Sequence, residues 1–161
     1  MTRSIVAARS MDSSCPIARS VSVLSDPWSF LLLREALLGR RTFAQFRDAL
    51  GIATDVLSAR LATLVEHGIM ERTPYREPGQ RTRDAYTLTP AGEELKTVLV
   101  ALQEWGTQHM PSEKPSRVRA LTRASRQPVH VGFIDDDGRK IAQDAVEFVR
   151  IENPSPVERR P

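Results

Sequence analysis

The chain has 161 residues, of which 40% are hydrophobic and 27% charged, and its formal net charge is +3. This length allows one domain with an appendage and a buried core, and the composition excludes a globally disordered chain. One cysteine and three scattered histidines provide no disulfide framework and no metal site, and no apolar run is long enough for a membrane span or a signal peptide.

From these exclusions we expect a cytoplasmic protein without a cofactor, a metal or a membrane contact. No phosphate-binding glycine loop, nucleophile elbow or Cys/His dyad is present, so we do not expect an enzyme. Residues 15–110 contain eleven basic and eleven acidic residues, and this balance leaves two local basic stretches over 40–60 and 72–83. Local basic stretches on a neutral domain favour a directed contact with a polyanion.

Four helices are predicted in succession after a flexible tail over 1–14. Their expected ranges are 16–25, 28–38, 42–51 and 53–67. Asp26-Pro27 is a start signal for the second helix, and Thr42 with Gln45 is a capping box for the third. In the fourth helix Leu57, Leu61 and Leu64 form the stripe expected to face the core, and among the aromatic residues Trp28, Phe30, Phe43 and Trp105 are also expected to be core residues.

A hairpin and a further helix follow. Ile69–Arg76 and Thr82–Thr89 predict two strands, because the Pro-Gly turn over 77–80 supplies the angles of a reversal. Thr89-Pro90 opens a helix with an apolar stripe of Leu95, Val98, Leu99, Leu102 and Trp105. The element order predicts an α+β, mainly helical fold, a winged helix-turn-helix with a small C-terminal β appendage.

The chain changes in character after residue 110. We expect the winged helix-turn-helix domain over 15–110, a linker over 111–127, a small β appendage over 128–151 and a disordered tail over 152–161. In the appendage, the alternation from Val129 to Phe133 and the apolar run Val146–Ile151 predict strands on either side of a turn. Lys114, Arg117, Arg119, Arg123 and Arg126 form a basic run without an acid before Asp135. We interpret this run as a solvated surface, with an extra phosphate contact as the alternative.

In a winged helix-turn-helix the second helix of the motif enters the major groove and the hairpin reaches the backbone or the minor groove. The helix over 53–67 is therefore the predicted recognition helix. Small polar residues near its start are expected to choose the sequence, and arginines to contact phosphates. The candidate DNA-binding residues are Arg40, Arg41, Thr54, Asp55, Ser58, Ala59, Arg76, Arg81 and Arg83. The alternative is a protein-interaction module that uses the scaffold without DNA.

Short motifs along the chain resemble those of HxlR-type bacterial transcriptional regulators. They occupy 15–17, 24–28, 33–39, 41–43, 56–61, 68–69, 86–92 and 104–105, together with Arg72 and Tyr75. The resemblance covers about 15–106 and implies a homodimeric DNA-binding repressor or activator, of which we expect a repressor. A symmetric dimer further predicts an inverted-repeat operator. Two positions depart from the family pattern. Ala53 replaces a Ser or Thr cap, which would shift capping to Thr54, and Asp55 replaces a frequent Asn.

The resemblance also implies a dimer built from the first and last helices of the domain. The candidate interface residues are Ile17, Val21, Leu95, Leu99, Leu102 and Trp105. Cys15 resembles the N-terminal cysteine of redox- and electrophile-sensing members and is the candidate sensor, favoured by a helix N-terminus and by Arg19. The alternatives are a small apolar residue in the interface and a regulator whose effector is a small molecule bound beside the central helix.

Overall fold

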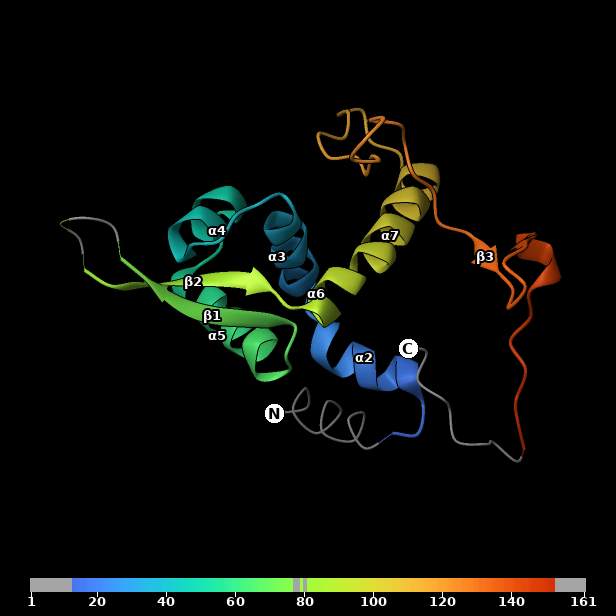
Figure 1. Cartoon of the computed structure of the whole chain (residues 1–161), viewed down its shortest axis with the longest axis horizontal. Coiled ribbons are helices and arrows are strands. Elements are labelled where there is room, and N and C mark those ends of the chain that lie inside the picture. Colours follow the sequence, from blue (N-terminus) through green and yellow to red (C-terminus); the bar gives the residue numbers. More distant parts are fainter. Residues whose placement is uncertain (1–12, 77–78, 80, 153–161) are drawn as a thin grey trace. The chain divides into compact units, whose positions relative to one another are not determined.

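The computed structural model describes residues 13–76, 79 and 81–152 (Figure 1). The expected tails over 1–14 and 152–161 therefore lie almost wholly outside the described residues. The chain divides into two compact units, Met1–Lys114 and Pro115–Pro161. The boundary between them falls within the range 111–127 expected for a linker.

In the described part of the first unit, four helices come first, α2 (Pro16–Leu24), α3 (Pro27–Leu37), α4 (Phe43–Leu50) and α5 (Thr54–Glu66). Both predicted start signals are confirmed. Asp26 accepts a hydrogen bond from the Trp28 backbone at 2.9 Å, and Thr42 and Gln45 form a reciprocal capping box. α3 is the central helix, since Leu32 and Leu33 are fully buried and pack with the leucines of α5 and with Phe46 of α4. Trp28, Phe30 and Phe43 pack against this core as expected.

The wing is an antiparallel hairpin of β1 (Met70–Tyr75) and β2 (Arg83–Leu88), with a register that runs from Met70 opposite Leu88 to Tyr75 opposite Arg83. Gly79 has the predicted positive φ, at 78°. Figure 1 shows the hairpin extending past α4 and α5 at one end of the unit. Its other end is anchored in the core, where Met70 is 1% exposed.

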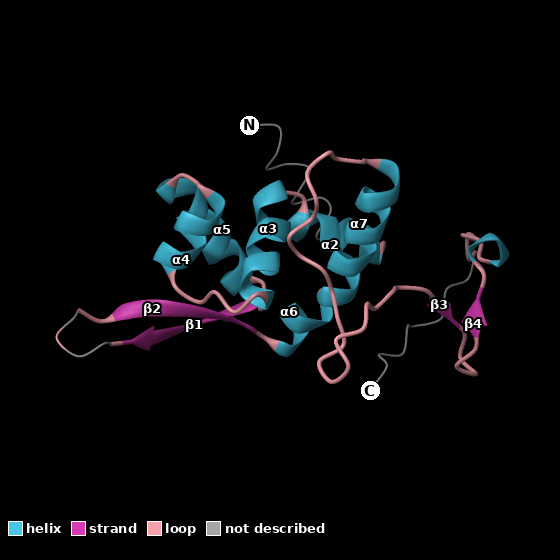
Figure 2. Ribbon diagram, turned by 90° about the horizontal axis from the view of Figure 1, so that it is seen from above, coloured by secondary structure: helices cyan, strands magenta, loops and turns pink. Residues whose placement is uncertain are grey.

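The last helical region is two helices, α6 (Pro90–Glu94) and α7 (Lys96–His109), where the sequence predicts one. The break is a tight turn in which the Leu95 amide donates to the Gly92 carbonyl at 3.3 Å, three residues back. Leu95 and Leu99 pack on the core. Trp105 is 57% exposed and lies outside this core, so its expected core position was wrong. Figures 1 and 2 both show α2 and α7 at the opposite end of the unit from the outer ends of β1 and β2.

The second unit contains two short strands, β3 (Phe133–Ile134) and β4 (Lys140–Ile141), and a single 3-10 turn, η1 (Gln143–Ala145) (Figure 2). The strands pair across the predicted acidic turn, where Asp135 accepts a hydrogen bond from the Arg139 amide at 2.8 Å. The predicted strand at 146–151 was wrong, because β3 is already paired with β4 and the apolar run has no ladder partner among the described residues. None of the described residues 115–152 is buried.

Candidate nucleic-acid interface

The predicted recognition helix α5 buries one face and exposes the other. Leu57, Leu61 and Leu64 are at most 1% exposed, which fixes the rotation of the helix about its axis. Thr54, Asp55, Ser58 and Ala59 are all exposed on its N-terminal half. These four side chains are therefore accessible to a DNA groove. Because all of them are short, they allow the helix to approach base edges closely.

The start of α5 differs from the expectation in one detail. The helix begins at Thr54, and Ala53 occupies the N-cap position in an extended conformation without a side-chain hydrogen bond. The expected cap at Thr54 was therefore wrong, because Thr54 already has helical geometry and lies one position too late to cap. Thr54 instead lies on the exposed part of α5 with the other groove candidates.

A buried carboxylate organises the segment that precedes α4. Glu35 of α3 has a side chain 5% exposed, and its Oε1 and Oε2 each lie 2.6 Å from a guanidinium nitrogen, of Arg34 and Arg40 respectively. The Arg40 amide also donates to the Glu35 carbonyl at 3.1 Å. One carboxylate shared by two guanidinium groups offsets only part of their charge, and the Arg40 side chain is 39% exposed. Arg40 therefore stays a candidate phosphate contact, with Glu35 as a partner that no local sequence pattern indicated.

The next two residues tie this segment to the wing. The Arg41 carbonyl accepts a hydrogen bond from the Tyr86 amide at 2.7 Å, and Thr42 forms an isolated antiparallel bridge with Ala85. The same segment is also bound to α4, because Gln45 Oε1 accepts hydrogen bonds from the amides of Arg41 and Thr42 at 2.8 and 3.1 Å. The helix-turn-helix motif and the hairpin are therefore joined by hydrogen bonds, which sets the position of the wing relative to α4 and α5.

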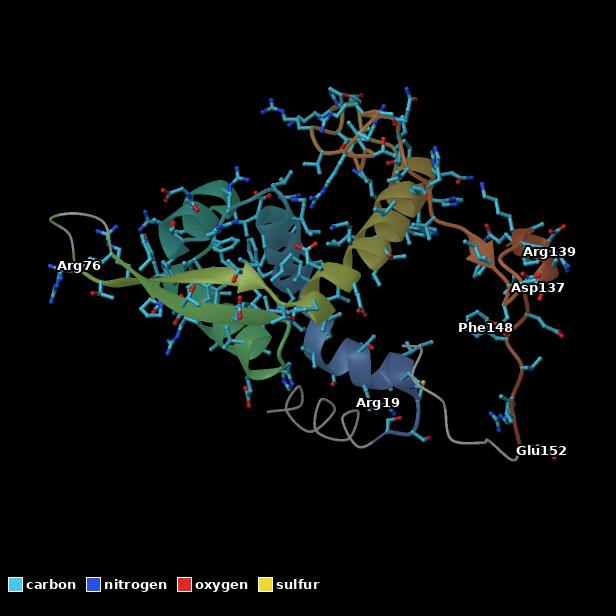
Figure 3. All side chains as sticks on the ribbon, in the orientation of Figure 1. Arg19, Arg76, Asp137, Arg139, Phe148 and Glu152 are labelled. Atoms are coloured by element: carbon cyan, nitrogen blue, oxygen red, sulfur yellow. The ribbon has the colours of Figure 1, made fainter. Side chains whose placement is uncertain are left out.

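The wing arginines lie on the surface. Arg76, Arg81 and Arg83 are all exposed, and Figure 3 shows Arg76 at the outer part of the hairpin, away from the helices. A groove of about 370 Å³ separates the hairpin from the start of α4. Its lining consists of Thr42, Phe43, Ala44, Tyr75, Arg83, Asp84 and Tyr86. Aromatic rings and a guanidinium at the edge of a groove are groups that can contact a sugar-phosphate backbone.

A second unexpected ion pair connects α5 to the start of α3. Arg60 Nε lies 3.5 Å from Asp26 Oδ2, while the other oxygen of the same carboxylate caps α3. The two residues are 34 positions apart in the chain, so no local pattern could have paired them. The pair connects the recognition helix to the junction between α2 and α3.

The expected dimer residues divide into two groups. Leu95 and Leu99 pack on the core of their own chain. Ile17, Val21, Leu102 and Trp105 are apolar side chains of α2 and α7 that are 48–62% exposed. Exposed apolar side chains that gather in one patch mark an interface. Cys15 is exposed at the N-cap of α2, and the Arg19 guanidinium donates to the Ser13 carbonyl at 2.6 Å.

The family model of the HxlR-like helix-turn-helix matches residues 23–114. The chain belongs to this family. It is 39% identical over 95 residues to the uncharacterised HTH-type transcriptional regulator Rv3095 of Mycobacterium tuberculosis, in a match that covers 59% of each protein. It is 40% identical over 100 residues to the uncharacterised HTH-type regulator sll1512 of Synechocystis, covering 62% of this chain and 73% of the relative. The chain thus spans 59% of the length of its mycobacterial relatives.

Solved structures agree with this assignment. The candidate transcription factor PA1607 has a TM-score of 0.77 and 35% identity, in a match that covers 89% of this chain and 99% of that one. The candidate transcription factor PA1374 of Pseudomonas aeruginosa has a TM-score of 0.61 and 35% identity, covering 88% of this chain and 96% of that one. The chain therefore contains a winged helix-turn-helix domain of the HxlR-like family, and the relatives that it matches are named as transcriptional regulators.

Two further observations concern metal ions and membranes. Within 13–76, 79 and 81–152, no three His, Cys, Asp or Glu side chains gather as a metal site would require. Among the helices of these residues, none has the length and apolar character of a membrane span.

Proposed function

We propose that the protein is a dimeric, sequence-specific DNA-binding repressor that recognises an inverted repeat. The observation that carries this proposal is the exposed N-terminal half of α5 beside a wing with three exposed arginines, all held on one unit by the contacts of residues 40–42. A mobility-shift assay with the promoter of its own gene tests it. Affinity should fall steeply with salt, because bound arginines displace counterions from phosphates. Binding that salt does not weaken would contradict the proposal.

Within the interface, α5 and the wing have separate tasks. Arg81→Ala should weaken binding to operator and to random DNA alike, and should flatten the salt dependence by about 0.9 in log–log slope for each phosphate that is no longer neutralised. Ser58→Ala and Asp55→Ala should change the preferred sequence with little effect on random DNA. An unchanged sequence preference in both α5 variants would refute the assignment of the recognition helix.

The dimer rests on the apolar surface of α2 and α7. Trp105→Glu places a charge at a side chain that is 57% exposed in the single chain and is expected to be buried between subunits. The variant should sediment as a monomer and should protect one half-site only. Leu38→Glu is the matched control, since Leu38 is 51% exposed but lies at the end of α3. Equal sedimentation of wild type and Trp105→Glu would exclude this interface.

Thiol oxidation at Cys15 is the proposed signal. Support comes from the exposure of Cys15 at the start of α2 and from two relatives of the same fold, the redox regulator HypR in its oxidised form at 26% identity and the Bacillus subtilis regulator YodB in its reduced form at 28%. Because the chain has a single cysteine, oxidation by diamide would join Cys15 to the partner subunit or to a small thiol. Diamide should lower the operator affinity of wild type and leave the operator affinity of Cys15→Ser unchanged. An equal response in both proteins would refute a thiol switch at Cys15.

The ion pair between Asp26 and Arg60 gives such a signal a route to DNA. Asp26 caps α3 directly after α2, and Arg60 lies on α5. A rotation of α2 in the dimer would therefore be felt at the recognition helix. Arg60→Gln should retain operator binding, and its affinity should respond less to diamide than that of wild type. If Arg60→Gln fails to bind the operator without oxidant, the ion pair has a purely structural role.

A further inference from the structure

The basic run of the second unit is exposed. Its members Arg117, Arg119, Arg123 and Arg126 all lie at the surface, and no acidic residue occurs between 114 and 134. Among the residues that the structure describes, no ion pair engages any of these four side chains. Four positive charges without a local counter-charge repel one another, and this cost is offset when a polyanion is bound.

The loop that carries two of these arginines is closed by hydrogen bonds. The Thr122 amide donates to the Gln127 carbonyl at 2.8 Å, and the Gln127 amide donates to Thr122 Oγ1 at 3.1 Å. Thr122 Oγ1 also lies 2.6 Å from Ser125 Oγ. Leu121 and Pro128 form a bridge at the base of the loop. Arg123 and Arg126 therefore project from a closed turn and not from an irregular linker.

Arg126 has an unusual backbone for its residue type. Its φ is 58°, and it is the only non-glycine residue with a positive φ in the described part of the chain. This region is unfavourable for a residue with a long side chain, and it persists where the surrounding contacts impose it. Here the Arg126 amide donates to the Thr122 carbonyl at 3.1 Å, which holds the residue in that conformation. The loop thus fixes the backbone position and conformation from which the Arg126 side chain extends.

We propose that this surface, formed by residues 117–126, is a second DNA-backbone contact that binds phosphates outside the half-site read by α5. The inference rests on the proposed DNA-binding function and extends it to a longer site. Double-stranded DNA is the polyanion that the first unit is proposed to bind, so the same ligand is available to the second unit. Exposed arginines are suited to contacts with phosphates. Seven residues lie between His109, at the end of α7, and Arg117, so the eight steps from one Cα atom to the other span at most about 27 Å.

Duplexes of two lengths test the proposal. One holds the footprinted operator alone and the other adds about one helical turn, roughly 10 bp, on each side. Wild type should bind the longer duplex more tightly, and the Arg123→Gln/Arg126→Gln variant should lack that advantage while binding the short duplex normally. On the longer duplex its salt slope should fall by about 2 per subunit, from about 0.9 for each phosphate that is no longer neutralised. The effect should be the same when the flanking sequence is changed.

Arg139→Gln is the matched control, because it removes one charge from the same unit. Figure 3 shows Arg139 beside Asp137, and their side chains form an ion pair at 3.1 Å. Its charge is already offset, so this variant should behave as wild type on both duplexes. Equal binding of wild type and the double variant to the longer duplex would overturn the second contact, and would leave the proposed function intact if Ser58→Ala still changes the preferred sequence. Absence of binding by wild type to either duplex would refute both.

Discussion

Removal of Glu35 is expected to destabilise the domain less than removal of its two arginine partners. The reason is unequal burial, since the Glu35 side chain is 5% exposed and those of Arg34 and Arg40 are each 39% exposed. Without the arginines, the carboxylate remains buried and uncompensated, a change that typically costs about 3–5 kcal/mol. Glu35→Gln removes the buried charge itself, and both guanidinium groups can be hydrated by water. Hydrogen bonds to charged groups contribute about 1.5–3 kcal/mol each, and relief of desolvation offsets much of this, so we expect a net loss of about 1–2 kcal/mol.

Urea unfolding followed by circular dichroism measures the difference. The variants are Glu35→Gln and the double variant Arg34→Gln/Arg40→Gln, compared at one protein concentration because a dimer's stability depends on it. Arg47→Gln is the control, since its pair with Asp48 at 2.8 Å is exposed on both sides, at 47% and 65%, and should contribute at most about 1 kcal/mol. A Glu35→Gln variant as unstable as the double variant would refute the reasoning from burial.

Three further predictions concern the domain that carries the interface, and thermal or urea unfolding checks each. Gly92→Ala should be strongly destabilising because its Cβ would overlap the Ile69 carbonyl oxygen, whereas Gly106→Ala, whose Cβ meets nothing within 4 Å, should stabilise α7 by about 0.5–1 kcal/mol. Thr42→Ala should lose about 1 kcal/mol with the capping box, and Thr42→Ser should retain most of it. Phe46→Ala, at a fully buried side chain, should cost about 3–5 kcal/mol.

The elements that could be predicted are those encoded by neighbouring residues. Asp26-Pro27 and the Thr42–Gln45 pair start helices through hydrogen bonds to amides two or three residues away, and such signals are complete within a short window. The leucine stripe of α5 likewise needs only the helical period, and its three members are buried as expected. The order of these elements was sufficient to predict the winged helix-turn-helix fold.

The features that were missed depend on distant or absent partners. The run Val146–Ile151 has strand-forming residues, but a strand requires a neighbour, and β3 and β4 already pair with each other across their tight turn. Arg60 and Asp26 meet because α3 and α5 pack together, and that packing is not encoded near either residue. Trp105 fits the apolar stripe of α7 but is exposed. Helical periodicity indicates on which face of a helix a residue lies, and it does not indicate what that face packs against.

The charge pairs change the interpretation of the basic stretches. In the first unit, Glu35 lies between Arg34 and Arg40, and further arginine pairs are Arg47 with Asp48, Arg60 with Asp26, and Arg72 with Asp84 across the wing. Within the described residues, Arg41, Arg81 and Arg83 have no such pair. A count of arginines over 40–60 therefore overstates the positive charge available near α4, in comparison with Arg81 and Arg83 on the wing and with the arginines of residues 117–126. Phosphate attraction should accordingly depend most on these two surfaces, because an arginine already paired with a carboxylate releases fewer counterions when it meets DNA.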